Sequence, residues 1–349
     1  MASSVSEPRV LCLGEALVDR LGPPGGDPAV DQPVDDRLGG APANVACGLA
    51  RLGTPVAFLV RLGDDAIGSS FRGLFVERKV ELGALQVDQI RPSRIVLVRR
   101  DRDGDRVFQG FDGDRGDGFA DQAFAQQEIA DQWSCLRGSA QWLLIGSIPL
   151  ASPLSASALL WCVAQAVESG LPIALDVNWR PTFWNAASAP DSGPDAAAIE
   201  AIKPLFAQAS LLKLAREEAL WFFASDDPEL IANTLQQKPD VVVTDGANPV
   251  RWFIQGCKGR MNVLAPPLVV DTTGAGDAFT AGMLHQLLTA PPAVGEQQRV
   301  EQIIRYAAAC GALVCQGAGG IDPQPTTEQV ETFLGSAAKT EDGRIRPLG

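Results

Sequence analysis

The sequence predicts an α/β protein with a doubly wound, mostly parallel sheet flanked by helices. Short apolar runs of strand length alternate with segments of helical periodicity along most of the chain, and this alternation favours parallel strands joined by right-handed crossovers. Hydrophobic residues make up 46% of the chain and charged residues 20%, which supplies enough apolar side chains for a sizeable core. The length of 349 residues allows two domains or one large α/β domain.

The first half of the chain opens with an apolar strand that ends at Gly14. A loop or edge segment rich in Gly, Pro and Asp follows, and the Gly-rich stretch 39–44 then leads into a helix that runs through Leu52. A buried strand and a second helix come next, the latter with Ile67, Phe71, Leu74 and Phe75 on one face. In chain order, the expected strand, loop, strand and second helix are residues 10–13, 22–36, 56–60 and 66–79.

Two strand-like runs, 95–98 and 106–109, flank the pair Asp103-Gly104. Asp-Gly between apolar runs is a strong hairpin signal. Because a hairpin fits poorly into a βα alternation, we place it outside the main sheet. Asp101, Asp103, Asp105 and Asp112 have the spacing of calcium ligands in an EF-hand, but Arg106 stands where that loop needs glycine, so a turn accounts better for the segment.

The second half repeats the strand and helix alternation and ends in helices. Residues 185–195 are rich in Ala, Ser, Pro and Gly and are expected to form a mobile surface loop. One C-terminal helix is expected at 275–288, and a second contains the apolar positions from Val300 to Val314. The short strands expected here are 142–145, 173–175, 211–214 and 241–244.

The charge balance excludes several classes of function. The chain carries 29 Lys and Arg against 42 Asp and Glu, a formal net charge of −13, so nucleic acid is not an expected partner. A small phosphate ligand remains compatible, because backbone N–H groups and a metal ion can hold it. The single histidine, His285, excludes a metal site built from several histidines and is expected to be structural.

The cysteines and the N-terminus bear on the compartment. Seven cysteines without a CxxC pair indicate free thiols in a reducing environment. The polar first nine residues lack an apolar leader, and no uninterrupted apolar stretch reaches the ~20 residues that a membrane helix needs. We therefore expect a cytoplasmic protein without membrane contact.

The segment 271–279, DTTGAGDAF, carries the most chemical information. An expected strand at 268–270 enters a Gly-rich turn that opens a helix, where the N–H groups of Gly274, Ala275 and Gly276 can receive phosphate oxygens. Asp277 in the first helical turn is suited to accept a proton from a hydroxyl that attacks the phosphate. An isolated GxGD pattern would be an ordinary helix start, and the nine-residue arrangement favours the catalytic interpretation.

This segment matches the C-terminal signature of the ribokinase-like, or pfkB, carbohydrate kinases, and residues 39–44 resemble their N-terminal signature. The resemblance extends from about residue 9 to about residue 325. It implies one ribokinase-like domain over 1–349, with a small β lid from segments of approximately 20–38 and 92–112. Such a lid would exclude water from the reaction.

The resemblance also implies which residues bind the sugar. Asp19 corresponds to the acid that follows the first strand of the family, and Gly39, Gly40 and Asn44 complete that group. Arg180, in the segment Asp176-Val177-Asn178-Trp179-Arg180, is expected to contact substrate near the phosphates. Carboxylate and amide groups suit vicinal hydroxyls. Taken alone, the glycine pair and Asn44 would be explained by a turn and a helix cap.

The same resemblance assigns ATP and metal contacts. Glu218 would organise Mg²⁺ through water, and Asp271 with Thr273 resembles part of a monovalent-cation site that would take K⁺. Ala215 replaces the usual Asn or Ser of the metal segment, and Ala308 replaces an Asn of the adenine site. The expected ATP-binding residues are Asn178, Lys213, Thr244, Gly246, Ala308 and Gly317.

The predicted function is ATP-dependent phosphorylation of a sugar hydroxyl with Asp277 as general base. Residues 14–19 and 39–46 look most like fructokinases, which favours fructose and its 6-phosphate, whereas 109–119 is unusual for them. Ribose, 2-keto-3-deoxygluconate or a nucleoside are alternative substrates, and a catalytically silent binding or scaffold protein is the alternative from another class. A homodimer through the lid is an expected assembly. Walker A and protein-kinase HRD motifs are absent.

Overall fold

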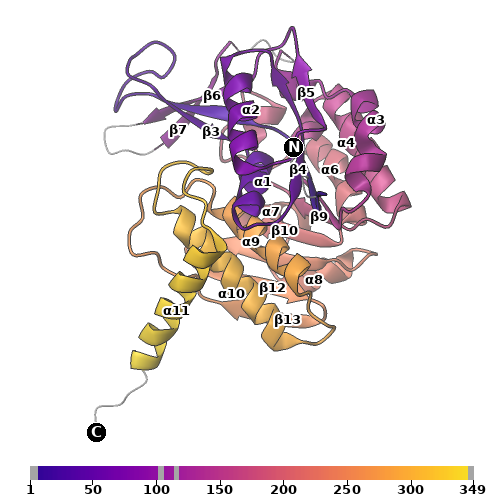
Figure 1. Cartoon of the computed structure of the whole chain (residues 1–349), viewed down its shortest axis with the longest axis vertical. Helices are drawn as coiled ribbons and strands as arrows, with labels where there is room; N and C mark the ends of the chain where they lie inside the picture. Colours follow the sequence, from indigo (N-terminus) through magenta and orange to yellow (C-terminus); the bar gives the residue numbers. More distant parts are fainter. Residues whose placement is uncertain (1–6, 101–105, 114–117, 345–349) are drawn as a thin grey trace, which may run out of the picture.

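The computed structural model describes residues 7–100, 106–113 and 118–344. It contains a nine-stranded sheet with helices on both faces and a separate four-stranded sheet at one edge (Figure 1). The doubly wound α/β fold predicted from the alternation is therefore confirmed. The expected Asp103-Gly104 turn lies outside the described residues, as do Asp101 and Asp105.

The main sheet has the strand order β13-β12-β11-β10-β9-β8-β1-β4-β5. Neighbours from β5 to β11 run parallel, whereas β12 and β13 add an antiparallel edge. The carboxyl ends of the parallel strands thus meet at one side of the sheet, where open α/β sheets bind ligands. The strands are β1 Val10–Leu13, β4 Val56–Gly63, β5 Leu85–Asp88, β8 Trp142–Ile145, β9 Ile173–Asp176, β10 Leu211–Ala215, β11 Asp240–Asp245, β12 Asn248–Ile254 and β13 Cys257–Met261.

Helices cover both faces because successive strand residues point to opposite sides. In β1, Val10 and Cys12 belong to the apolar core under α1, α2, α9 and α10, and Leu11 and Leu13 to the core under α3, α4, α6, α7 and α8. The helices are α1 Ala41–Arg51, α2 Ala66–Arg78, α3 Gln126–Arg137, α4 Pro153–Glu168, α5 Pro181–Trp184, α6 Ala196–Gln208, α7 Arg216–Phe223, α8 Pro228–Thr234, α9 Ala275–Thr289, α10 Gln297–Val314 and α11 Thr327–Arg344, with 3₁₀ turns η1 Ala120–Gln122 and η2 Ile148–Ala151.

The small sheet is the lid. Its order is β3-β2-β6-β7, with β2 and β6 parallel and the other pairs antiparallel. The hairpin predicted outside the main sheet is present as β6 and β7, and the loop expected at 22–36 joins β2 to β3. The lid strands are β2 Leu17–Leu21, β3 Asp35–Gly39, β6 Arg94–Arg100 and β7 Arg106–Phe111.

One predicted strand is wrong. Residues 268–270 form no strand, and Leu268, Val269 and Val270 are each more than half exposed. Pro266 and Pro267 have no N–H to give to a ladder, and the segment is held mainly by the N–H of Val270, which donates to the carbonyl of Cys315 at 2.8 Å. An apolar run of strand length was therefore not enough to make a strand.

Two further observations concern the sequence predictions. His285 lies on α9, shares a 2.8 Å hydrogen bond with the Thr54 hydroxyl and stacks on Tyr306, as a structural residue would. Across the described residues, no helix is both long and apolar enough to cross a membrane.

Candidate active site

A hollow of about 480 Å³ lies where the carboxyl ends of the parallel strands, the start of α9 and the lid meet. It brings together residues that are far apart in the sequence, among them Asp19, Asn44, Arg180, Lys213 and Asp277. Asn178, Glu218, Gly40, Thr273 and the turn 274–276 also line it. Most residues predicted for the sugar and the phosphates therefore share one cavity.

The Gly-rich turn requires its first glycine. Gly274 is the N-cap of α9 at φ 78°, and a Cβ there would lie 2.5 Å from the Cα of Gly320. A side chain would thus meet both strain and a backbone clash. Gly276 passes close to Lys213, whose Nζ would be 3.1 Å from an added Cβ. The turn brings the positive end of the 15-residue helix α9 to the cavity, as phosphate binding needs.

Asp277 has the environment of a general base. Its Oδ2 accepts a 2.7 Å hydrogen bond from Nδ2 of Asn44, which fixes the carboxylate across from α1. Burial, reinforced by the charge of Asp176, raises the pKa of Asp277 to about 6, against the opposing effects of Asn44, Lys213 and Arg180. A carboxylate poised near neutral pH is a better proton acceptor than an ordinary aspartate.

A buried ion pair supports the turn from behind. Nζ of Lys213 on β10 lies 3.1 Å from Oδ1 of Asp176 at the end of β9, and the Thr280 hydroxyl of α9 donates to Oδ2 at 2.9 Å. Although burial opposes it, the pKa of Lys213 is raised by Asp176, Glu218 and Asp277, so its ammonium stays charged. The network therefore joins two strands of the sheet to the helix that presents Asp277.

The hollow also brings together the residues predicted to bind sugar. Asp19 comes from lid strand β2, and a Cβ on Gly39 would lie 3.5 Å from its Oδ2 and 3.9 Å from Oδ1 of Asn44. Gly40 has φ 101°, and a Cβ there would lie 2.7 Å from the carbonyl oxygen of Glu15. The two glycines thus let the polar side chains and the chain after β1 approach closely.

Glu218 holds two loops of the site. Its Oε1 accepts the N–H of Trp179 and its Oε2 the N–H of Ala215, both at 2.7 Å. The side chain is buried, and burial raises its pKa. Asn178, next to Trp179, has φ 47°. With both oxygens on backbone N–H groups, Glu218 fits a metal contact through water better than a direct one.

The carboxylate of Asp271 likewise accepts hydrogen bonds from neighbouring groups. Its Oδ1 accepts from the N–H and the hydroxyl of Thr273, and its Oδ2 accepts the N–H of Gly319 at 2.8 Å. These bonds tie the start of the Gly-rich turn to the loop after α10. Across the described residues, no three acidic, histidine or cysteine side chains gather as a ready metal cage.

Four residues predicted for ATP are not among the described residues that line this hollow. Thr244 donates from Oγ1 to the carbonyl of Leu214 at 3.4 Å, and Gly246 follows it at the end of β11. Ala308 is 6% exposed and packs in the core under α9 and α10. An alanine at this position has no polar atom to reach a base, unlike the Asn it replaces. Gly317 lines a different groove.

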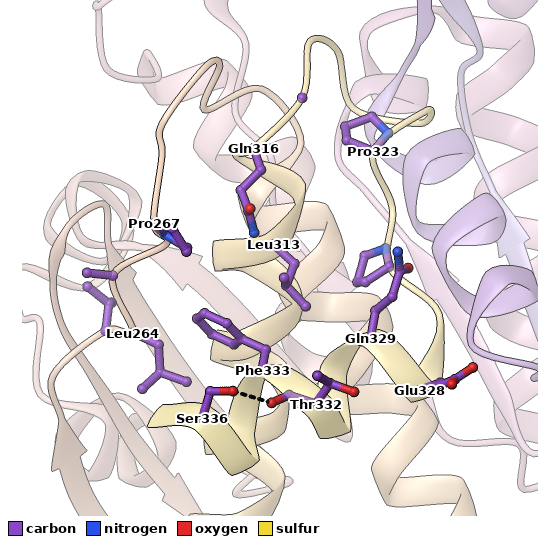
Figure 2. Close-up of a pocket in the computed structure, with 14 residues that line it drawn as sticks. Leu264, Pro267, Leu313, Gln316, Pro323, Glu328, Gln329, Thr332, Phe333 and Ser336 are labelled. Atoms are coloured by element: carbon purple, nitrogen blue, oxygen red, sulfur yellow. Dashed lines mark hydrogen bonds between the residues drawn. The ribbon is translucent and has the colours of Figure 1, made fainter. Parts of the chain in front are cut away.

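That groove, of about 1080 Å³, lies between the segment before the Gly-rich turn and the C-terminal helices. In Figure 2, Leu264 and Pro267 face Leu313 of α10 and Phe333 of α11. Glu328 is the only charged residue among its described lining residues. A largely apolar groove with one acid does not suit phosphate, so the smaller hollow is the candidate for phosphate binding.

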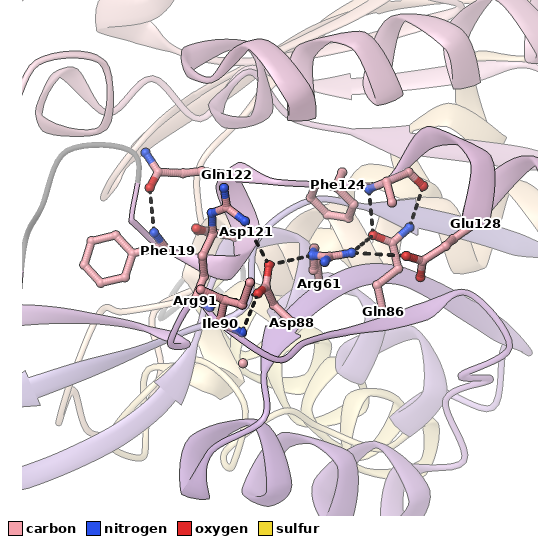
Figure 3. A network of polar contacts seen from close by, with 12 residues as sticks. Arg61, Gln86, Asp88, Ile90, Arg91, Phe119, Asp121, Gln122, Phe124 and Glu128 are labelled. Atoms are coloured by element: carbon pink, nitrogen blue, oxygen red, sulfur yellow. Dashed lines mark hydrogen bonds and ion pairs between the residues drawn. The ribbon is translucent and has the colours of Figure 1, made fainter.

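Two polar networks fix the base of the lid, and Figure 3 shows the first, around Asp88 and Arg61. Asp88 at the end of β5 accepts the N–H groups of Ile90 and Arg91 and pairs with Arg61 at 3.0 Å. Although burial opposes it, these groups lower the pKa of Asp88 to about 2. The turn into β6 is therefore held by a carboxylate that stays ionised.

The second network is a caged ion pair. Arg94, the first residue of β6, donates from Nε and Nη2 to the two oxygens of Asp121 at 2.8 and 2.9 Å, and both side chains are 4% exposed. Its guanidinium lies 4.5–4.8 Å from the ring centres of Phe111, Phe119 and Phe183. Because Phe183 lies in α5, which begins directly after Arg180, this cage connects the lid to the segment that carries Arg180.

Sequence reasoning assigned no role to several residues of the site. Glu15 is buried against the hollow, Thr280 holds Asp176, and Phe108 and Phe183 form an apolar wall under the lid. The signal for Glu15 was available, since a charged residue directly after an apolar strand marks the carboxyl edge of the sheet. The wall could not be foreseen, because it depends on how the lid packs.

Comparisons with known proteins agree with this geometry. Residues 7–327 match the model of the pfkB family carbohydrate kinases. A probable fructokinase-7 of Arabidopsis thaliana is 30% identical over 338 residues, covering 95% of this chain and 94% of the relative. The probable chloroplastic fructokinase-6 of the same plant is 29% identical, covering 95% of this chain and 84% of the relative.

Solved structures of fructokinases are also similar to this chain. A fructokinase with bound ATP from Xylella fastidiosa superimposes with a TM-score of 0.79 at 25% identity, covering 94% of this chain and 98% of the other. A fructokinase double mutant from Vibrio cholerae, bound to fructose, ADP and potassium ion, superimposes at 0.76 with 27% identity, covering 95% of this chain and 100% of the other. The chain belongs to the pfkB family of carbohydrate kinases, which are ATP-dependent phosphotransferases.

Proposed function

We propose that the protein transfers the γ-phosphoryl group of ATP to fructose and forms fructose 6-phosphate. The observation that carries the proposal is the position of Asp277, held by Asn44 beside the N-terminus of α9 in a hollow that also contains Asp19. The fructokinase names of the similar proteins support fructose over ribose or another sugar.

In the proposed reaction, the sugar lies between the lid and α1, with hydroxyls on Asp19 and Asn44. The Asp277 carboxylate accepts the proton of the attacking hydroxyl, and the N–H groups of the turn 274–276 stabilise the transferring phosphoryl group. Lys213 keeps a positive charge directly behind Gly276, and Arg180 adds another at the side of the hollow. These fixed charges favour the anionic transition state without moving during the reaction.

The residues present fit Mg²⁺ at the ATP phosphates. Glu218 would hold it through water, as its two backbone contacts leave it acceptor capacity. Bound Mg²⁺ supplies neutralisation of phosphate charge. Asn178 would contact the phosphates from the same loop. For the base of ATP, we retain Thr244, Gly246, Ala308 and Gly317 as residues near its path, and Asp271 with Thr273 as a K⁺ site.

We also propose that 1–349 acts as one domain whose lid closes on the sugar and excludes water. The outer strands β3 and β7 each have a free edge within the lid sheet, which suits pairing with a second copy. Sedimentation of the purified chain measures this, and a strictly monomeric species at micromolar concentration would rule out the homodimer.

The function is tested by measuring ADP release against fructose, ribose, 2-keto-3-deoxygluconate and nucleosides. Fructose should give the highest kcat/KM, and Asp277→Asn should lose 10²–10⁴-fold in kcat. Asp240→Asn, at the far end of β11, is a matched control because burial also raises the pKa of Asp240, and it should keep full activity. Near-normal turnover by a folded Asp277→Asn would refute the role of the base, and preference for another substrate would refute fructose.

A further inference from the structure

Glu15 is a buried acid that the proposed reaction does not use. It follows β1 and Gly14, is 2% exposed and lines the hollow together with Asn44 and Asp277. Its backbone carbonyl lies close to Gly40, and its side chain contacts the start of α1. A carboxyl group so deeply buried needs either a cation or a proton.

The described contacts of Glu15 include no cation. Its Oε1 accepts the N–H of Ala41, the first residue of α1, at 3.2 Å. Two nearby buried acids each have a cationic partner: Asp121 pairs with Arg94, and Asp176 pairs with Lys213. The carboxyl group of Glu15 also accepts from its own backbone N–H, so the donors described around it are backbone N–H groups rather than cations, and the residue lines the hollow.

The surroundings of Glu15 favour its neutral form. Burial, together with the charges of Asp121 on η1 and Asp277 on α9, raises the pKa of Glu15 to about 8, although its own N–H and that of Ala41 oppose the rise. Arg94 is engaged by Asp121, and Lys213 by Asp176. Near pH 7 the group therefore keeps an acceptor oxygen for Ala41 and gains an O–H donor.

We propose that Glu15 is a substrate-binding residue that donates a hydrogen bond through its neutral carboxyl to an oxygen of the bound sugar. This inference rests on the proposed function. Asp19 is an acceptor as a carboxylate, so Glu15 supplies the complementary donor that a hydroxyl or carbonyl oxygen of a polyol requires. Ionised Glu15 has no proton to donate, so an ether or carbonyl oxygen, or a hydroxyl whose own proton is donated elsewhere, would lose this hydrogen bond.

The test compares sugar KM between pH 7 and 9 at saturating Mg-ATP. For the wild type, KM should rise about tenfold over this range as a group with a pKa near 8 loses its proton. Glu15→Gln mimics the neutral acid in shape and in donor and acceptor groups, so its KM should stay within about twofold of the wild type at pH 7 and remain flat to pH 9.

Glu15→Ala removes the donor, and its KM at pH 7 should increase about tenfold or more with a smaller change in kcat. Asp240→Asn is the control and should retain the wild-type rise of KM with pH. Circular dichroism and thermal unfolding establish whether each variant is folded. If Glu15→Ala does not fold, the pH dependence of KM in Glu15→Gln alone tests the proposal.

The outcomes separate the two proposals. Fructose turnover by the wild type, together with a pH-dependent KM in Glu15→Gln that equals that of the wild type, overturns the role of Glu15 and leaves the function intact. A KM for Glu15→Gln at pH 7 as high as that of Glu15→Ala also overturns it, because a carboxylate is then required. Absence of turnover by the wild type with every sugar overturns the function and the inference together.

Discussion

At the scale of single residues, the candidate site combines one poised base with fixed positive charges. Asp277 is half-buried, hydrogen-bonded to Asn44 and within the field of Lys213 and Arg180. Several acids lie in or beside this hollow in different surroundings. Asp176 pairs with a lysine, Glu218 accepts from two backbone N–H groups, and Glu15 is buried without a cation among its described contacts. The electrostatic balance of the site therefore depends on which acids hold protons.

The pH profile of catalysis should report Asp277. A base with a raised pKa of about 6 is active only when deprotonated, so kcat/KM should fall about tenfold for each pH unit below 6 and level off toward about pH 7. Lys213→Met removes a charge that lowers this pKa, so the midpoint should move to higher pH. Initial rates between pH 4.5 and 7.5 measure both, and a flat wild-type profile would contradict the assignment.

Gly274 should tolerate no side chain. Gly274→Ala places a Cβ 2.5 Å from Gly320 at a positive φ, so the turn must move. A displacement of about 1 Å at a reacting centre costs on the order of 10²-fold in rate, and kcat should fall by that amount. Gly73→Ala on α2 meets nothing within 4 Å and should leave steady-state kinetics unchanged; equal activity of both variants would argue against a constrained turn.

At the scale of elements, the base of the lid depends on the pair Arg94 and Asp121. Arg94→Met leaves a buried carboxylate without its partner, so the free energy of unfolding should drop by about 3–5 kcal/mol. Arg94→Met combined with Asp121→Asn removes that charge and should recover part of the loss. Denaturant titration measures both values. In the Arg94→Met variant, ATP hydrolysis without sugar should also increase, because a loose lid admits water. A double variant that is no more stable than the single variant would contradict the charge argument.

The helices and strands also show which parts of the fold local sequence patterns can predict. Strands such as 10–13 and 142–145 were predicted with their boundaries, since buried parallel strands are short continuous apolar runs. The site residues around Asp277 were recognisable because a Gly-rich turn must be encoded locally. The run 268–270 is no strand because two prolines precede it. β12 and β13 were not predicted because, with one partly exposed face, they lack the continuous apolar runs of the buried parallel strands. Arg94, Phe111, Phe119 and Phe183 meet only through tertiary packing, which no local pattern encodes.

At the scale of the whole molecule, the ionised carboxylate of Asp277 lowers the free energy of unfolding. The pKa of Asp277 in the folded protein lies above that of an unfolded aspartate, so folding takes up a proton between about pH 4 and pH 6. The contribution of Asp277 to the free energy of unfolding is complete below pH 4 and is lost as the pH rises through 6. Asp277→Asn should therefore raise the free energy of unfolding at pH 8 by on the order of 2 kcal/mol and leave it unchanged near pH 4.

Urea titration of the wild type and of this variant at both pH values provides the measurement. A variant that is equally stabilised at pH 4 and pH 8 would show that the effect does not come from ionisation. A variant destabilised at pH 8 would show that the Asn44 contact outweighs the cost of the buried charge.

The lid contributes Asp19 from β2 and Gly39 from β3, whereas the Gly-rich turn and Asp277 belong to α9 of the main body. In the proposed reaction, most residues that recognise the acceptor are thus encoded in a stretch of the gene separate from the Gly-rich turn and Asp277. If that proposal holds, changes in the first 110 or so residues would alter which alcohol is accepted and leave the Gly-rich turn and Asp277 unchanged. A scaffold divided in this way allows new substrate ranges to arise by local replacement, and it makes exchange of the lid strands a direct route to redesigning selectivity.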